Sequence, residues 1–322
     1  MNAPRSWAAG ACVGGRTYAE KVAGTEIAET DETDFEQHRR YLGAVAYRML
    51  GSLADAEDVL QEAWLRWRAV DHAAVGNPRG YLTTVVTRLC YDQLGSARAR
   101  REAYFGEWLP EPLVAQDAPP SPQDRAELGE DVSYAVMALL ERLSPAERAA
   151  FVLHDVFGVD FPLIAAALER SEPAVRQLAS RARKQIKEST PRRTVDRATH
   201  RQAVEAFAAA VDRGDIMSLM KVLDPETVWH ADGGGIVRAG TRAVYGAEKV
   251  SRLILGLIER FYDPGTITAF VDVNGELGIA FYTPEGTAYG ALSLCVDGSG
   301  RITEFYIVVN PEKLTRVAAA AG

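Results

Sequence analysis

The segment Ser171–Lys187, SEPAVRQLASRARKQIK, constrains most strongly what this chain can fold into. At 100° per residue its apolar residues fall on one narrow stripe of a helix, formed by Val175, Leu178, Ala179, Ala182 and Ile186. The opposite side is polar and basic, with Arg176, Gln177, Ser180, Arg181, Lys184 and Lys187. Arg and Lys bind phosphates and guanine edges, and Gln and Ser can read base edges in a major groove. Any one of these residues could belong to an ordinary solvated face, but together they predict a helix that packs on one side and binds DNA on the other.

The preceding residues predict the rest of a helix-turn-helix. Ser144–Glu147 reads as a capping box with Pro at the first helical position, so a helix begins there. Gly158 is a candidate left-handed terminator of that helix. Asp160 can cap a short second helix, and Ser171 can cap the last one. Short helices joined by tight turns, with the basic face last, are typical of a DNA-reading helix-turn-helix.

Length and charge agree with a multidomain DNA-binding protein. The chain has 322 residues, 47% of them hydrophobic, which predicts two or three domains with ordinary cores. The net charge is −8, but the stretch 171–197 carries eight Arg and Lys against three acidic residues. The local field matters more than the total charge for phosphate binding. By contrast, Asp34–Asp58 is acidic and suggests a surface for a protein partner.

Cysteine usage and hydropathy indicate a reduced, cytoplasmic protein. Cys12, Cys90 and Cys295 are far apart and form no CxxC or Cys/His pattern, so neither a disulfide framework nor a zinc site is expected. No apolar run approaches 18 residues, and the N-terminus has no apolar core of a secretory signal. We expect no metal and no cofactor.

Composition predicts the domain boundaries. Glu107–Pro122 contains five prolines and cannot be a helix interior, and Ser189–Pro191 marks a second break. The predicted organisation is a disordered N-terminal extension (1–34), a helical domain (35–103), a Pro-rich linker (104–130), the helix-turn-helix domain (131–190) and a third block (199–322).

The helical domain shows a polar face on its second helix. Helical periodicity covers Phe35–Leu50, Asp55–Trp67 and Arg79–Ser96. The second of these leaves Glu57, Asp58, Gln61, Glu62 and Arg66 on its outer side, and the third continues into a basic tail.

The motifs DAEDVLQEAWLRW and NPRGYLTTVVTRLCYDQLGSARARRE, followed by the helix-turn-helix, resemble regions 2 and 4 of an extracytoplasmic-function (ECF) RNA polymerase sigma factor. The resemblance covers about Phe35–Ile186 and implies two all-α domains that bind core RNA polymerase and promoter DNA. The polymerase contact would lie on Asp58, Gln61, Glu62 and Arg66. Recognition of the −35 element would lie on Ser171, Arg176, Gln177, Ser180, Arg181 and Lys184. Recognition and melting of the −10 element would lie on Asn77, Arg79, Tyr81, Arg88, Tyr91, Arg98, Arg100 and Arg101.

The chain departs from the family pattern at Glu169, where many members have Gly in the turn before the last helix. We expect Glu169 to continue the preceding helix by one residue, which changes the geometry of the turn. Tyr81 is as well suited to a core as to stacking on a base, and Arg98–Arg101 could be a solvated helix end.

The third block has an α+β pattern. Helices are expected at Thr199–Arg213, Asp215–Leu223 and Ala247–Arg260, and strands at Glu226–Ala231, Thr266–Val273, Leu277–Thr283, Thr287–Val296 and Ile302–Val309. Tight turns such as Asn274–Gly275 join the later strands as hairpins. Helices followed by an antiparallel meander resemble the SnoaL-like branch of the NTF2 fold, a cone of curved sheet and helices.

Three short motifs resemble those of the sigma-J type (ECF group 41), which carries a fused SnoaL-like domain. They are Trp108-Leu109-Pro110-Glu111-Pro112, Asp232-Gly233-Gly234-Gly235 and Asn310-Pro311-Glu312-Lys313-Leu314. Ile236 stands where the family's glycine motif continues with Lys, and Glu312 where Asp is common. The resemblance implies regulation in cis by the third block, with no separate anti-sigma factor. We interpret Trp108 as a preorganised anchor for the contact between the third block and the sigma regions. Because the third block is tethered to those regions, it meets them at high effective concentration, which favours such a contact.

The sequence leaves other functions open for the third block and for the whole chain. His230 and Asp232 lie two residues apart in an expected strand and would face the same side, so a catalytic pair or a small-ligand site in the third block is possible, although we expect no enzyme. The alternative function is a ligand-responsive helix-turn-helix regulator that acts without core polymerase. The polar face Glu57–Arg66 favours the sigma factor, since a stand-alone regulator has no need of it.

Overall fold

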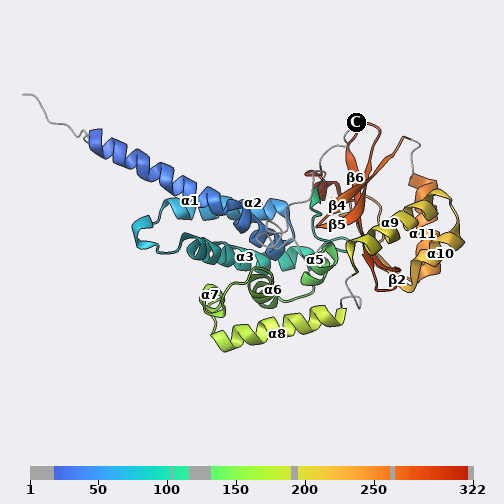
Figure 1. Cartoon of the computed structure of the whole chain (residues 1–322), viewed down its shortest axis with the longest axis horizontal. Helices are drawn as coiled ribbons and strands as arrows, with labels where there is room; N and C mark the ends of the chain where they lie inside the picture. Colours follow the sequence, from blue (N-terminus) through green and yellow to red (C-terminus); the bar gives the residue numbers. More distant parts are fainter. Residues whose placement is uncertain (1–17, 103, 116–131, 190–194, 262–264, 318–322) are drawn as a thin grey trace, which may run out of the picture.

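The computed structural model describes residues 18–102, 104–115, 132–189, 195–261 and 265–317. The side chains of 18–33 and 96–102 fall outside the described part. A helical part and an α+β domain lie side by side, and the long α1 helix projects from the far end of the helical part (Figure 1).

The first helical domain consists of α1 (Tyr18–Leu50), α2 (Leu53–Arg68), a short 3-10 helix (His72–Ala74) and α3 (Pro78–Glu102). Helix α2 begins after Ser52, whose hydroxyl accepts the Asp55 amide. Because α1 begins at Tyr18, the prediction of a disordered extension over 1–34 does not hold for 18–34, and 1–17 lie outside the described residues.

The second helical domain contains the predicted helix-turn-helix and an additional helix before it. Its elements are α5 (Tyr134–Leu140), α6 (Pro145–Phe151), a π-helical turn (Val152–Val156), α7 (Phe161–Ala167) and α8 (Glu172–Ser189). The predicted capping box between Ser144 and Glu147 is confirmed, and Gly158 has the left-handed φ of 66° expected of a terminator. Asp160 occupies the N-cap position of α7, but its side chain makes no capping hydrogen bond.

Glu169 corrects the expectation for the turn before α8. Helix α7 ends at Ala167, and Glu169 does not continue it but adopts a φ of 53°. This left-handed conformation is the one that Gly adopts without a steric penalty, which costs other residues roughly 1–2 kcal/mol. The turn therefore keeps the geometry that Gly would give, at a cost in stability.

One hydrophobic core joins the two helical domains. It includes Leu42, Trp67 and Leu82 of the first domain together with Ile164 and Leu178 of the second. At their boundary a buried ion pair joins Arg148 of α6 and Glu141 at 2.7 Å, and Arg148 Nε also donates to the carbonyl of Arg48 in α1. The two domains therefore pack against each other as one unit.

The C-terminal domain has the predicted α+β order. Its elements are α9 (Arg197–Asp212), α10 (Ile216–Val222), β2 (Leu223–Asp232), β3 (Val244–Tyr245), α11 (Ala247–Phe261), β4 (Ile267–Val273), β5 (Glu276–Tyr282), β6 (Ala288–Val296), β7 (Ile302–Val308) and a 3-10 helix (Pro311–Lys313). The sheet order is β1-β4-β5-β6-β7-β2-β3, where β1 (Val114–Ala115) comes from the linker, β4 to β7 are antiparallel and β2 is parallel to β7. The predicted fold class is confirmed.

Both faces of this sheet are covered. One face packs on α9, α10 and α11 through residues such as Trp229, Leu294 and Phe305. The other face packs on the linker and α5, with Leu109 and Tyr134 in its core. The linker also contributes the edge strand β1 (Val114–Ala115), which pairs antiparallel with β4. The predicted Pro-rich spacer is therefore, over 104–115, part of the C-terminal domain's packing.

Candidate functional site

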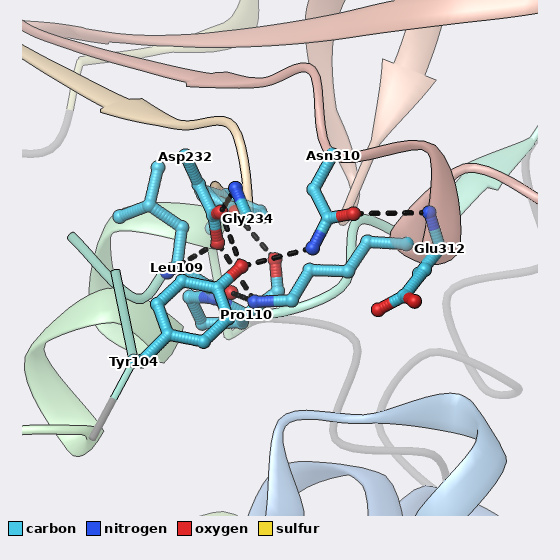
Figure 2. A network of polar contacts seen from close by, with 9 residues as sticks. Tyr104, Leu109, Pro110, Asp232, Gly234, Asn310 and Glu312 are labelled. Atoms are coloured by element: carbon cyan, nitrogen blue, oxygen red, sulfur yellow. Dashed lines mark hydrogen bonds and ion pairs between the residues drawn. The ribbon is translucent and has the colours of Figure 1, made fainter. Parts of the chain in front are cut away.

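Asp232, the last residue of β2, is the centre of a buried polar network between the linker and the C-terminal domain (Figure 2). Its side chain is 0% exposed. The Tyr104 hydroxyl donates to Oδ1 at 2.6 Å and the Leu109 amide donates to Oδ2 at 2.9 Å. The Lys313 ammonium lies 2.7 Å from the same Oδ2. Buried charges are stable in proteins when they are paired and hydrogen-bonded, as Asp232 is.

Lys313 contacts the linker in addition to Asp232. Its Nζ donates to the carbonyl of Leu109 at 2.6 Å and lies 3.3 Å from the centroid of the Trp108 ring. A cation over the face of Trp is attracted by the ring quadrupole. Tyr104 packs edge-on against Trp108 at 4.8 Å, which completes an aromatic wall around the ammonium. The Lys313 ammonium thus connects the C-terminal motif to both Trp108 and Leu109 of the linker.

The glycines after Asp232 allow the backbone to lie close to the side chain of Asn310. Gly234 has a φ of 65°, and a Cβ there would lie 2.5 Å from Nδ2 of Asn310. Only Gly combines this φ with this proximity. The turn is completed by hydrogen bonds from the amides of Ile236 and Val237 to the Gly233 carbonyl. Ile236, which stands in place of the family's Lys, is 57% exposed.

Asn310 connects its own motif to the glycine motif and to Tyr104 of the linker, a residue that the sequence motifs did not include. Its Nδ2 donates to the Tyr104 hydroxyl at 2.9 Å, and its backbone amide donates to the Asp232 carbonyl at 3.0 Å. Its Oδ1 accepts the Glu312 amide and caps the 3-10 helix. The Glu312 carboxylate points out of the network in Figure 2, and its residue is exposed. We refer to Tyr104, Trp108, Leu109, Asp232, Asn310 and Lys313 as the latch.

The other motif residues support the latch by packing. The Pro110 carbonyl accepts the Tyr134 hydroxyl at 2.6 Å, which connects the linker to α5. Pro112 and Leu314 are buried. A Cβ at Gly235 would contact the Phe105 side chain at 3.2 Å. Pro311 is the first residue of the 3-10 helix and is exposed.

Glu107 and His230 form a second linker contact that the motifs did not predict. His230 Nδ1 lies 2.9 Å from Glu107 Oε1, and the imidazole stacks on Tyr306 with centroids 5.0 Å apart. His230 and Asp232 share one side of β2, as expected, but that side faces the linker rather than the helices of the domain. No sequence pattern indicated this partner, because Glu107 is 123 residues away along the chain.

A second cluster fastens the linker and the C-terminal domain to the first helical domain. The Glu111 carboxylate accepts the Leu53 amide at 2.7 Å, at the start of α2, and the Glu111 carbonyl accepts the Tyr47 hydroxyl at 2.7 Å. Asn274, in the β4–β5 turn, donates its Nδ2 to Tyr47 at 2.9 Å and accepts the Leu113 amide at 3.0 Å. Glu111 therefore stabilises the positive end of α2, as an acidic group at a helix N-terminus does.

Burial perturbs the ionisation of this cluster. Desolvation raises the pKa of Tyr47 to about 12 against the lowering effect of Asn274. Desolvation likewise raises the pKa of Glu111, although hydrogen bonds from the Leu53 and Ala54 amides and nearby cations lower it. In the latch, burial and then the Asp232 carboxylate raise the pKa of Tyr104. The tyrosines therefore act as neutral hydrogen-bond donors at physiological pH.

The predicted polymerase face is exposed on α2. Asp58, Gln61, Glu62 and Arg66 are all exposed, and Arg66 pairs with Glu62 at 2.9 Å. Leu65, 60% exposed, lies among them and was not predicted as a contact. On the adjacent side Arg316 of the C-terminal domain lies 3.5 Å from Glu57 of α2.

The predicted DNA-reading face of α8 is also exposed. The apolar stripe of α8 is buried, as periodicity predicted, except that Ile186 is half-buried. The readers Ser171, Arg176, Gln177, Ser180, Arg181 and Lys184 are exposed. Arg176 pairs with Glu172 at 2.5 Å and Arg181 pairs with Glu147 at 2.9 Å, but each guanidinium keeps exposed N–H donors with which it could bind DNA.

The predicted −10 residues differ in what their side chains contact: Asn77 and Arg79 have partners in or next to the first helical domain, whereas Arg88 and Tyr91 bond to the second. Asn77 and Arg79 are exposed and line a cavity of about 290 Å³ between α3 and α7, and Arg79 lies 4.1 Å from the Tyr41 ring. Arg88 donates to the Ala166 carbonyl of the second helical domain at 3.0 Å. Tyr91 accepts a hydrogen bond of 3.4 Å from Arg170.

Tyr81 packs against the helical core beside Trp67, so it is as much a packing residue as a candidate base platform. Arg98, Arg100 and Arg101 lie on α3, but their side chains fall outside the described part. Among the described residues, no helix has both the length and the hydrophobicity needed to cross a lipid bilayer.

Comparison with known families supports the division into two sigma regions. The sigma-70 region 2 family matches residues 35–100, and the sigma-70 region 4 family matches residues 133–186.

The chain is also similar to curated proteins over most of its length. It is 42% identical to ECF RNA polymerase sigma factor SigJ of Mycobacterium tuberculosis, over 88% of this chain and 93% of that protein. It is 36% identical to the probable ECF RNA polymerase sigma factor SigI of the same species, over 88% and 95%. The crystal structure of Mycobacterium tuberculosis SigJ superimposes with a TM-score of 0.70, at 38% identity, covering 88% of this chain and 98% of that one.

Proposed function

Because the chain belongs to the ECF sigma factors, which direct promoter-specific initiation by RNA polymerase, we propose that its C-terminal domain regulates this activity in cis. Its partners are core RNA polymerase and promoter DNA. The alternative of a helix-turn-helix regulator that acts without core polymerase is set aside by the family. A sigma factor is not an enzyme.

The buried ion pair between Lys313 and Asp232 carries the proposal, because both of its charged groups also bind the linker. Lys313 also binds the Leu109 carbonyl and the Trp108 ring, and Asp232 also binds Tyr104 and the Leu109 amide. Separating the linker from the C-terminal domain would leave these buried groups without those partners. The latch therefore favours one arrangement strongly.

In that arrangement, two of the residues that we propose for −10 recognition form hydrogen bonds within the protein. Arg88 and Tyr91 bond to the second helical domain, and the two helical domains share one core. The linker supports this packing through Pro110, which binds Tyr134 of α5, and Glu111, which binds the start of α2. We propose that the latched chain is the less active state and that opening the latch frees α3 for promoter DNA. This would supply in cis what an anti-sigma factor supplies elsewhere, so no separate one is required.

The individual contact residues remain proposals. For the polymerase we propose the exposed α2 face of Asp58, Gln61, Glu62 and Arg66. For the −35 element we propose the exposed side of α8, and for the −10 element the loop and helix from Asp71 to Arg101. We also propose that the C-terminal domain has no catalytic pair, because His230 Nδ1 and both carboxylate oxygens of Asp232 are bonded to residues of the linker.

The test is run-off transcription by core polymerase reconstituted with the full chain or with Lys313→Met. Promoter fragments are first selected from random-sequence DNA by the wild-type holoenzyme. We expect the variant to give more transcript at matched protein concentration, with the largest gain where sigma is limiting. Copurification of the chain with core polymerase checks the partner independently.

Glu312→Gln is the matched control, because its exposed carboxylate lies in the same motif but outside the latch. It should transcribe like wild type. Equal transcription by Lys313→Met and wild type would refute regulation through the latch, and a loss of transcription would show that the latch assists initiation.

A further inference from the structure

A cavity of about 550 Å³ lies in the C-terminal domain where α10, the start of β2 and the start of α11 meet. It is distinct from the latch. Its walls are Met220 and Lys221 of α10, Leu223 and Pro225 of β2, the segment Tyr245–Lys249 and Arg301, which directly precedes β7. A volume of this size is in the range of small-molecule pockets.

The lining combines a cationic rim with an apolar wall. Lys221, Lys249 and Arg301 are exposed at the cavity, while its one lining carboxylate, Glu248, pairs with Arg252 at 2.6 Å. The apolar wall comprises Met220, Leu223, Pro225, Tyr245 and Ala247. The first turn of the 15-residue helix α11 adds its positive end to the same place. These features together suit a molecule with an anionic head on an apolar body.

The backbone beside the cavity is irregular. Between Leu223 and Val228 the register of β2 against β7 shifts from Ile302 to Glu304, so β2 carries extra residues there. β-bulges of this kind occur frequently next to binding sites. Within the bulge Thr227 is 0% exposed, and its Oγ1 has no hydrogen-bond partner among the described residues. Its carbonyl accepts the Gly246 amide, which leads into α11. The bulge therefore interrupts the regular pairing of β2 with β7 beside the cavity.

The same two strands lead from the cavity to the latch. β2 begins at Leu223 in the cavity wall and ends at Asp232. β7 follows Arg301 of the cavity and is followed by Asn310, which bonds to the Asp232 carbonyl. The strands are parallel neighbours, paired from Val228 and Glu304 to Asp232 and Val308. Two paired backbones therefore connect the cavity to both Asp232 and Asn310 of the latch.

We propose that this cavity binds an amphipathic anion, a carboxylate or phosphate on an apolar body, and that its occupancy changes the strength of the latch. The binding rests on the cavity alone, while the regulatory consequence rests on the function proposed above. The paired strands β2 and β7 join the cationic pocket to the buried ion pair, so the two sites share a connecting element, as this proposal of coupling requires.

The test is calorimetric titration of the full chain with decanoate, with decan-1-ol as the uncharged probe of equal chain length and inorganic phosphate as the charge without the apolar body. We expect saturable binding of decanoate, at least about tenfold tighter than that of either other probe, as expected for the gain of one charge-assisted contact. The double variant Lys249→Glu/Arg301→Glu should bind decanoate at least about tenfold more weakly. Both side chains are exposed, so the fold should persist. Lys187→Glu on α8 is the matched charge reversal and should bind as wild type does.

Coupling is tested by repeating the decanoate titration with Lys313→Met. Because coupling between two sites is reciprocal, breaking the latch should change the Kd by about fivefold or more. An unchanged Kd would overturn the coupling. Binding that does not saturate, or is equal for decanol or for the double variant, would overturn the site. Neither result depends on transcription, so failure of the site is distinguishable from failure of the regulatory function, which is judged by Lys313→Met without ligand.

Discussion

Replacing Lys313 by Met isolates the contribution of the latch cation. Met is unbranched and similar in length, so the contact with the Trp108 ring can be kept while the ion pair is lost. Removing one partner of a buried ion pair costs about 3–5 kcal/mol, because the other charge stays buried without compensation. Asp232 retains hydrogen bonds from Tyr104, Leu109 and Gly234, so we expect the lower end, about 3 kcal/mol.

Native-state hydrogen exchange measures this loss where it occurs. The Leu109 and Gly234 amides both donate to the Asp232 carboxylate, so they exchange when the latch opens. A loss of about 3 kcal/mol corresponds to roughly 100-fold faster exchange at both amides. Amides of α8 provide the internal control, since α8 packs in the core of the helical domains, whereas Leu109 of the latch belongs to a different core. Their exchange should be unchanged.

A double-mutant cycle with Asp232→Asn decides whether the two charges act on each other. We expect the double variant to be more stable than the sum of the single effects implies, with a coupling energy of about 2 kcal/mol, because no uncompensated charge remains. Additivity within about 0.5 kcal/mol would refute the reasoning, and so would equal acceleration of exchange in α8.

Three further predictions concern other parts of the chain. Glu169→Gly should raise the unfolding free energy by about 1 kcal/mol, or the Tm by about 2–4 °C, because Gly adopts the φ of 53° without strain; an equal gain from Glu169→Ala would contradict this. Burial is the main cause that raises the pKa of Glu111 above 4.5, so the folded chain binds more protons at this carboxyl than the unfolded chain does. The protonated carboxyl therefore contributes stability that is fully present below pH 4.5. This contribution is lost as the pH rises through the raised pKa. Glu111→Gln cannot ionise, so its unfolding free energy relative to wild type should increase from pH 4.5 upward, and a difference that does not vary with pH would contradict the assignment. Gln177→Ala should alter the preferred −35 sequence in holoenzyme binding assays, whereas an equal loss on all promoter sequences would count against Gln177 as a base reader.

Much of the fold could be predicted because its signals are local. Helical periodicity located the helices of both sigma regions except α5, and the capping box at Ser144 placed the start of α6. In the C-terminal domain the predicted helices and strands differ from the observed ones by a few residues at their ends. The Glu169 turn was predicted wrongly, because the position needs a left-handed φ whatever residue occupies it, and only the packing of α7 and α8 imposes that need.

The sequence contains one indication that both faces of the sheet are covered. It is the continuous apolar run of one strand, which differs from the usual alternation of polar and apolar residues. β6 is buried on both sides along most of its length, and its sequence ALSLCV is nearly continuous in apolar residues. Such a run is typical of a strand covered on both faces. It indicates that something covers the sheet opposite its own helices, but not that the cover is the linker and α5.

By itself, the sequence determined the family, the helical elements, the α+β domain and the three motifs of the latch, since each depends on residues close together along the chain. The tertiary structure alone decided that those motifs meet at one carboxylate, that Glu107 pairs with His230, and that Asn274 reaches Tyr47 across 227 positions. Side chains so far apart are brought within hydrogen-bond distance by the packing of whole domains, and that packing depends on both faces of the sheet at once. No local pattern of residues contains that information.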